Sequence, residues 1–253
     1  MGRLQTNSSA AETHCVGCGA RDWTVCSSLT DDELSVLEGI RLGHRDYRAG
    51  ADFLRQGEPQ REVLTLLEGW AMRYCLLENG SRQIIDFCLP GAFIGFQPDG
   101  ESPKGYAAQA ITDIKVCALP QKGLMDMMRQ TPNMAIRLAC IGYRDQMAMA
   151  RHLANVGRRR ARGRVSNLLM ELFVRVRMRS EAAAGEAILL PLTQELIGDA
   201  LGLTSVHVNR TLRGLREDKI VSLKGGTLRI LDPDRLAEEA GFEDGVDVLE
   251  SFS

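Results

Sequence analysis

The chain has 253 residues and a formal net charge of −2, with 44% apolar and 25% charged residues. This balance is typical of a soluble globular protein and excludes a disordered or fibrous chain. The sequence contains neither an apolar leader nor a run of about eighteen apolar residues, so we expect no secretion and no membrane span, and a cytoplasmic protein.

Residues 1–29 are expected to form a cysteine-rich N-terminal segment. Cys15, Cys18 and Cys26 follow the spacing C-x2-C-x7-C in a glycine-containing loop, and Cys117 lies further along in the stretch KVCALP. A chain without an export signal keeps its thiols reduced, so metal binding, redox chemistry or simple burial is expected rather than a disulfide framework. Four soft thiolates suit either an iron-sulfur cluster or zinc, and the spacing alone does not decide between them.

Residues 30–120 are expected to form a sensor domain. Thr30 precedes three acidic residues and an apolar periodicity, which predicts a short capped helix. From about Leu42 to Leu119, short apolar stretches alternate with glycine-containing turns about every ten residues. This pattern predicts an antiparallel sandwich, and the length suits a small jelly roll.

Residues 121–157 are expected to be helical, with a break at Pro132. Within the long segment after the break, apolar residues fall near heptad spacing, which predicts a dimerisation helix. Its predicted contact residues are Met134, Leu138, Ile141 and Ala148. The alternative is a helix that packs on its own sandwich, and a DNA reader with two-fold symmetry favours the dimer.

Residues 158–253 are expected to form a winged helix-turn-helix domain with an acidic C-terminal tail. Thr193 can cap one helix, Gly202 can end it by adopting a positive φ, and Thr204 can cap a second helix after a short turn. The predicted core of the pair consists of Ile197, Ala200, Leu203, Val208 and Leu212. The predicted outward face consists of Ser205, Val206, His207, Asn209, Arg210 and Arg213.

The outward face of the second helix has the chemistry needed to read DNA. Arg210 can donate two hydrogen bonds to a guanine, and Asn209 and His207 can reach a base edge or a phosphate. A hairpin around Gly225 and Gly226 would add a wing with Lys224 and Arg229 near phosphates. Positions 151–179 contain nine arginines and only one acidic residue. This basic block is a further candidate for contact with phosphates.

Two stretches give the chain a family resemblance over nearly its whole length. The stretch LTQELIGDALGLTSVHVNRTLRGL resembles the signature of the Crp/Fnr family, and FCLPGAFIGF followed by YAAQAITDIKVCALP resembles its oxygen-sensing Fnr branch. The signature positions present here are Gly198, Leu201, Gly202, Leu203, Thr204 and Arg210.

The resemblance implies an α+β fold: an N-terminal antiparallel β jelly roll like a cyclic-nucleotide-binding domain, a long dimerisation helix and a C-terminal winged helix-turn-helix. It also implies a homodimer on double-stranded DNA with a palindromic operator, acting on RNA polymerase as activator or repressor. The Fnr recognition helix has a Glu-x-x-Ser-Arg pattern, whereas this chain has Val206, Asn209 and Arg210, so the usual half-site cannot be assumed.

The resemblance further implies a [4Fe-4S] cluster on Cys15, Cys18, Cys26 and Cys117, which promotes dimerisation and operator binding and which oxygen dismantles. Cys75, Cys88 and Cys140 are then expected to be buried core thiols. No cyclic AMP binding is expected, because Gly91 is followed by Ala92, no arginine stands beside Tyr106 in the sequence, and Lys104 is a poor substitute.

Several alternatives remain open at this point. The thiols can hold zinc or act as a redox pair, or the sandwich can bind heme or a small ligand. An enzyme with a jelly-roll metal site is not expected, because no histidine cluster lies between Asp46 and Cys117. A scaffold protein with a vestigial helix-turn-helix is the remaining possibility, and salt-dependent DNA binding would exclude it.

Overall fold

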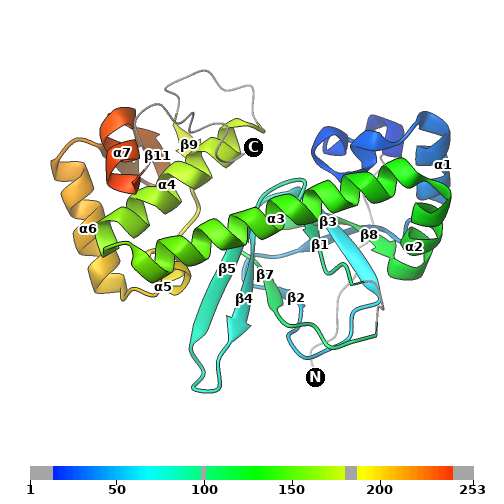
Figure 1. Cartoon of the computed structure of the whole chain (residues 1–253), viewed down its shortest axis with the longest axis horizontal. Helices are drawn as coiled ribbons and strands as arrows, with labels where there is room; N and C mark the ends of the chain where they lie inside the picture. The colour runs from blue at the N-terminus through cyan, green and yellow to red at the C-terminus, as the bar shows by residue number, and fades with distance from the viewer. Residues whose placement is uncertain (1–13, 98–100, 180–186, 242–253) are drawn as a thin grey trace. The chain divides into compact units, whose positions relative to one another are not determined.

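The computed structural model describes residues 14–97, 101–179 and 187–241 (Figure 1). The predicted acidic tail lies outside the described residues from position 242 onward. The chain divides into two compact units, one of residues 1–81 and 86–143 and the other of residues 82–85 and 144–253. Among the described residues, no helix is long and apolar enough to cross a membrane.

The first unit begins with three short 3-10 turns, Cys15–Gly17, Arg21–Trp23 and Val25–Ser28, which carry the clustered cysteines. Helix α1 (Asp31–Ile40) follows, as predicted. The Thr30 hydroxyl accepts a hydrogen bond from the Glu33 N–H, and the Glu33 carboxylate accepts one from the Thr30 N–H. This reciprocal pair satisfies two backbone donors that a helix start otherwise leaves without partners.

The predicted jelly roll is confirmed. It consists of two four-stranded antiparallel sheets with strand orders β1-β8-β3-β6 and β2-β7-β4-β5. Apolar side chains from both sheets form the core between them, including Leu64 and Val116 from the first sheet and Ala108 from the second, which are fully buried. The strands are β1 (Gly43–Tyr47), β2 (Asp52–Leu54), β3 (Glu62–Glu68), β4 (Ala71–Leu76), β5 (Arg82–Cys88), β6 (Phe93–Ile94), β7 (Ala107–Ala110) and β8 (Ile114–Pro120).

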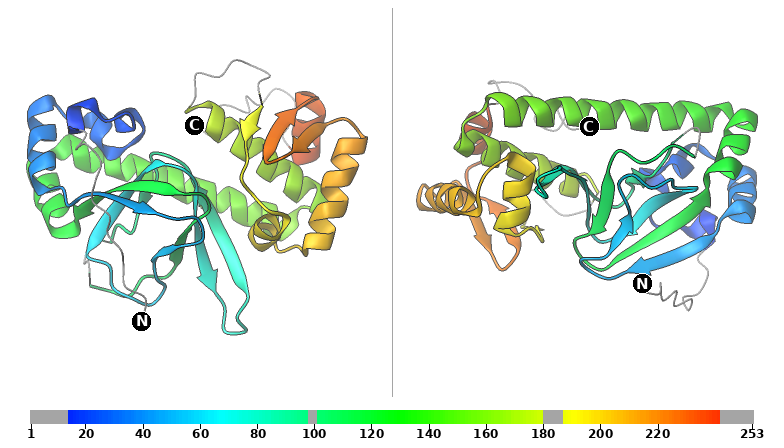
Figure 2. Two further views of the ribbon diagram at one scale, coloured as in Figure 1. Left: turned by 180° about the vertical axis from the view of Figure 1, so that it is seen from behind. Right: turned by 90° about the horizontal axis from the view of Figure 1, so that it is seen from below.

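Two helices follow the roll, and they separate where the sequence predicted a break. Helix α2 (Gln121–Gln130) ends before Pro132, and α3 (Pro132–Arg158) continues as one long helix. In Figure 2, α1 and α2 lie side by side at one end of the roll. A second core joins these helices to the cysteine-rich segment, with Cys15, Leu34, Leu124, Met134 and Leu138 among its buried members.

The burial of α3 residues corrects part of the predicted dimer seam. Met134 is fully buried and Leu138 is 9% exposed, both within the core of their own chain, while Ile141 packs against that core and Ala148 is half-buried. Two rows of residues at heptad spacing run along this helix, and the sequence prediction chose the row that faces its own chain. The pattern could not separate the rows because both have the same period.

The second unit contains the predicted winged helix-turn-helix. Helix α4 (Ala161–Arg177) packs against α6 (Ser205–Glu217) and α7 (Pro233–Ala240). Helix α5 (Gln194–Leu201) precedes α6, and β10 (Val221–Lys224) and β11 (Thr227–Ile230) form the hairpin. Strand β9 (Ile188–Leu189) pairs with β11, so the wing is a three-stranded sheet rather than the hairpin alone.

Candidate functional site

The turn between α5 and α6 forms as the sequence predicts. Thr193 accepts a hydrogen bond from the Leu196 N–H at 3.2 Å (N to Oγ1), and Thr204 accepts one from the His207 N–H at 3.3 Å. Gly202 ends α5 with φ 63° and ψ 38°, a conformation that favours glycine. A Cβ at Gly198 would lie 2.5 Å from the Leu203 carbonyl oxygen, so the turn requires glycine there as well.

Burial along α5 and α6 agrees with the predicted inward and outward faces. Ile197, Ala200, Val208 and Leu212 are buried and Leu203 is half-buried. All six residues predicted to face outward are exposed: Ser205, Val206, His207, Asn209, Arg210 and Arg213. The second helix therefore presents one polar face that its own domain leaves uncovered.

Five of these outward residues and Gln194 line an open hollow of about 450 Å³ on that face. Asn209 Nδ2 donates to Gln194 Oε1 at 3.0 Å, and Arg213 Nε donates to Glu217 Oε1 at 2.7 Å. The Arg210 guanidinium forms no hydrogen bond or ion pair with any described residue. Sequence reasoning missed Gln194, although its position next to the capping residue Thr193 could have indicated it.

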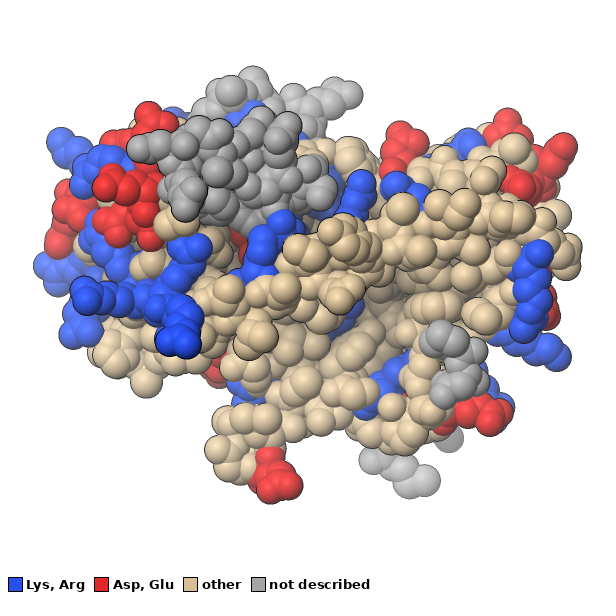
Figure 3. Space-filling model, viewed as in Figure 1, with Lys and Arg blue, Asp and Glu red and all other residues tan. Residues whose placement is uncertain are grey.

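The wing adds basic side chains near the same helix. Gly225 and Gly226 both have positive φ, 56° and 74°, as a tight hairpin turn requires. Lys224 and Arg229 are exposed on the two strands of this hairpin. Figure 3 shows basic side chains gathered over the part of the unit that contains α6.

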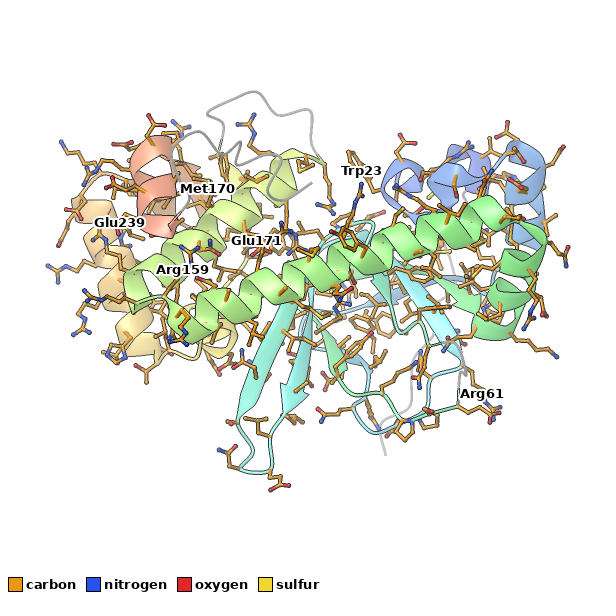
Figure 4. The ribbon with its side chains drawn as sticks, viewed as in Figure 1. Trp23, Arg61, Arg159, Met170, Glu171 and Glu239 are labelled. Atoms are coloured by element: carbon orange, nitrogen blue, oxygen red, sulfur yellow. The ribbon has the colours of Figure 1, made fainter. Side chains whose placement is uncertain are left out.

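The arginine-rich block contributes less to this surface than the sequence suggested. Arg162 bonds Asp218 and Glu239, each at 2.7 Å, and Arg164 donates to the Leu201 carbonyl at 3.0 Å. Arg159 and Glu239, both labelled in Figure 4, belong to this internal network. Part of the block therefore joins α4 to its neighbours, and Arg158 and Arg160 are its exposed members.

In the first unit, the cysteine-rich segment is anchored to α1 and to the roll. The Glu38 carboxylate accepts a hydrogen bond from the Cys15 N–H at 3.0 Å and lies 2.7 Å from His14 Nδ1. These two contacts hold the pKa of Glu38 below its usual value. Gly91 has a φ of 94°, and a Cβ there would lie 2.7 Å from the Cβ of Trp23. The glycine therefore allows the segment to pack closely on the roll.

The four predicted cysteines lie within electrostatic range of one another. Burial, followed by the charges of Cys26, Cys15 and Cys18, raises the pKa of Cys117 to about 12, and Arg41 acts in the opposite direction. Burial also raises the pKa of Cys15 and of Cys26. These three thiols are therefore protonated at neutral pH in the metal-free protein.

The thiols are gathered but are not arranged as metal ligands. Within the described residues, no group of three or more His, Cys, Asp or Glu side chains is placed so that it could hold a metal ion. Of the other cysteines, Cys88 is buried and Cys75 is half-buried, but Cys140 is exposed on α3. The prediction that Cys140 is a core thiol is therefore wrong, because it lies on the side of that helix opposite the buried Met134 and Leu138.

Among the described residues of the roll, Arg73 and Lys104 are buried cations. Arg73 forms an ion pair with Asp86 at 2.8 Å and lies over the Tyr106 ring, 5.8 Å from its centroid. Lys104 is 4% exposed, and its ammonium donates to the Gly95 carbonyl at 2.8 Å and to Gln97 Oε1 at 2.7 Å. The sequence reasoning overlooked Arg73 because it reaches Tyr106 from a neighbouring strand.

Comparison with known proteins agrees with this architecture. Residues 163–239 match the Crp-like helix-turn-helix domain, and residues 44–131 match the cyclic nucleotide-binding domain. The chain is 32% identical over 231 residues to the transcriptional activator protein FnrL of Cereibacter sphaeroides, covering 90% of this chain and 92% of that protein. It is 25% identical over 230 residues to the transcriptional activator protein anr of Pseudomonas aeruginosa, covering 91% and 93%.

Among solved structures, FixK2 from Bradyrhizobium japonicum matches with a TM-score of 0.69 and 26% identity, covering 79% of this chain and 98% of that one. FnrL and anr are both transcriptional activators, and each is aligned with at least 90% of this chain. The chain therefore belongs to the Crp/Fnr family of DNA-binding transcription regulators.

Proposed function

We propose that this regulator is controlled by oxygen through a [4Fe-4S] cluster held by Cys15, Cys18, Cys26 and Cys117. The observation that carries the proposal is the gathering of four thiols from two separate segments, the N-terminal turns and β8, within electrostatic range of one another. Thiolates are the usual ligands of such clusters. The Fnr-like relatives add support for the same reading.

The chemistry of these donors fits an iron-sulfur cluster, although the thiols must converge to bind it. Burial raises the pKa values of Cys15, Cys26 and Cys117, so a cluster would displace protons when it binds. Arg41 lowers the pKa of both Cys15 and Cys117 and would compensate part of the negative charge of four thiolates. When bound, the cluster supplies an oxygen-labile link between the N-terminal segment and the roll.

The connection to α3 suggests how such a site could control DNA binding. Cys15 and Cys26 pack in the same core as Met134 and Leu138, so rearrangement of the segment would change how α3 is held. We propose that the intact cluster favours a homodimer in which both recognition helices engage a palindromic operator. Oxygen would shift the population toward a state that binds weakly.

The outer row of α3 is the surface that we propose for the dimer. It follows a spacing of four and three residues, and all its members are exposed, including Ile136 at 62% and Tyr143 at 64%. The row consists of Ile136, Cys140, Tyr143, Met147, Ala150 and Ala154. Recruitment or obstruction of RNA polymerase by the DNA-bound dimer completes the proposed function.

The test is purification without oxygen, followed by measurement of visible absorption, iron and sulfide. We expect a charge-transfer band that bleaches in air, and loss of bound iron in a Cys117→Ser variant. The matched control is Cys75→Ser, which changes a half-buried thiol outside the proposed ligand set. A colourless protein that holds zinc or no metal would overturn the cluster while leaving DNA binding in place.

The second candidate is the same regulator with a different signal, namely zinc or thiol redox chemistry, heme or a small ligand. The gathering of Cys15, Cys18, Cys26 and Cys117 favours thiol chemistry within this alternative. A cyclic nucleotide is the least supported ligand. Arg73 and Lys104 already have partners in the roll, so binding the phosphate would require breaking these contacts.

A further inference from the structure

Val206 is an apolar residue in a position that folding does not explain. Its side chain is 77% exposed, the largest value among the exposed large apolar residues that the structure describes. It lies in the first turn of α6 and lines the same hollow as Asn209 and Arg210. Single exposed apolar residues are common on protein surfaces, so it is the position of Val206 beside Asn209 and Arg210 that points to a contact with DNA.

The neighbours of Val206 restrict what that contact can be. Arg210 follows four residues later and therefore lies on the same face of α6, with its guanidinium available to an external partner. Asn209 has its Nδ2 donor engaged by Gln194. Arg213, which also lines the hollow, is paired with Glu217, so Arg210 is the cation in the hollow that has no partner among the described residues.

The edges of base pairs in the major groove include one apolar group, the 5-methyl of thymine. We propose that Val206 contacts this methyl group, so that the operator half-site carries a T·A pair near the G·C pair that Arg210 reads. Four residues of helix rise about 6 Å, which corresponds to about two base-pair steps. The thymine should therefore lie within about two positions of the guanine.

This inference rests on the proposed DNA binding but not on the iron-sulfur cluster. It assigns a specificity role to the residue at which the chain departs from the Glu-x-x-Ser-Arg pattern. A glutamate there would accept a hydrogen bond from cytosine, whereas valine offers no acceptor and favours the methyl of thymine. The departure then means a changed half-site rather than a lost contact.

The test begins with selection of binding sequences from random DNA duplexes by the full-length protein, purified and kept without oxygen so that the proposed weakly binding state is avoided. Each thymine of the selected half-site is then replaced, one at a time, by deoxyuridine, which lacks only the 5-methyl group. We expect one position per half-site at which the replacement weakens binding about four-fold, as loss of one buried methyl predicts. At the other thymines we expect no change.

Two variants complete the test. Val206→Ser leaves no apolar group at this position and is expected to bind the selected DNA but to lose the thymine preference, with a ratio near one between thymine and deoxyuridine. Leu231→Ser makes a comparable change at an exposed apolar residue outside α6 and is expected to keep the wild-type ratio.

A specific sequence that is insensitive to deoxyuridine, or a Val206→Ser variant with the wild-type ratio, would overturn this inference alone. Failure to select any sequence would overturn the proposed DNA binding and the inference with it.

Discussion

Replacing Gly91 with alanine should detach the cysteine-rich segment without altering a thiol. Gly91 has a φ of +94°, and an added Cβ would lie 2.7 Å from the Cβ of Trp23 and 2.9 Å from its carbonyl oxygen. An alanine in this conformation costs about 1–2 kcal/mol, and the forced displacement costs about 1–3 kcal/mol more. We therefore expect Gly91→Ala to lower the free energy of unfolding by about 2–5 kcal/mol.

The matched control separates backbone strain from the contact with Trp23. Gly80 has a φ of +80°, and no described atom lies within 4 Å of the place where its Cβ would be. Gly80→Ala should therefore cost only about 1–2 kcal/mol. The destabilisation by Gly91→Ala should therefore exceed that by Gly80→Ala by about 1–3 kcal/mol, which is the cost of displacing Trp23.

The assay is the rate at which Cys15 reacts with a thiol reagent in the metal-free protein, followed residue by residue with mass spectrometry. Cys15 is 8% exposed, so it must become exposed by local opening before it reacts. A difference of about 1–3 kcal/mol predicts a rate about 5 to 150 times higher in Gly91→Ala than in Gly80→Ala. Equal rates in the two variants would refute the reasoning.

Three further predictions concern the DNA face, the dimer and the thiols. Arg210→Ala should relax base preference and cost about 1–3 kcal/mol per half-site, whereas Lys224→Ala should weaken binding to all sequences and lower the salt slope by about one, both measured by DNA titration. Mild oxidation should link two copies through Cys140, seen as a covalent dimer on a non-reducing gel that Cys140→Ser does not form. Because burial raises the pKa of Cys117 to about 12, the metal-free fold should lose stability as pH rises above about 9, measured by urea unfolding against Cys117→Ser.

Each of these has a contradicting result. Unchanged discrimination between specific and random DNA in Arg210→Ala would exclude base reading by that residue. A covalent dimer that persists in Cys140→Ser would exclude the outer row of α3 as the source of the link. Between the pKa of the unfolded thiol and that of the folded thiol, the folded state keeps a proton that the unfolded state loses, so rising pH favours unfolding. The same pH dependence of stability in wild type and Cys117→Ser would contradict this prediction.

The sequence predicted best those features that depend on local backbone chemistry. Thr193 and Thr204 cap helices through their own hydroxyls, and Gly202 takes a positive φ, each within a few residues of the signal. The jelly roll was predictable for the same reason, since turn residues recur between short apolar strands. The face of α6 followed once its ends were known.

Features that depend on distant contacts were not predictable from the sequence pattern. The two rows of α3 share one period, so only the fold reveals that Met134 and Leu138 face their own chain. The internal partners of Arg162 come from α6 and α7, far along the chain, and charge counting cannot identify them. Strand β9 has two residues, too short to carry a periodicity.

The central claim is that the thiol site controls DNA binding in response to oxygen. The most direct test measures the dissociation constant for the selected operator on one anaerobic sample, before and after exposure to air, together with its bound iron. The account predicts that affinity falls as iron is lost, and that both changes are absent in Cys117→Ser because that variant starts in the weakly binding state. Unchanged affinity in a sample that has lost its iron would contradict the account.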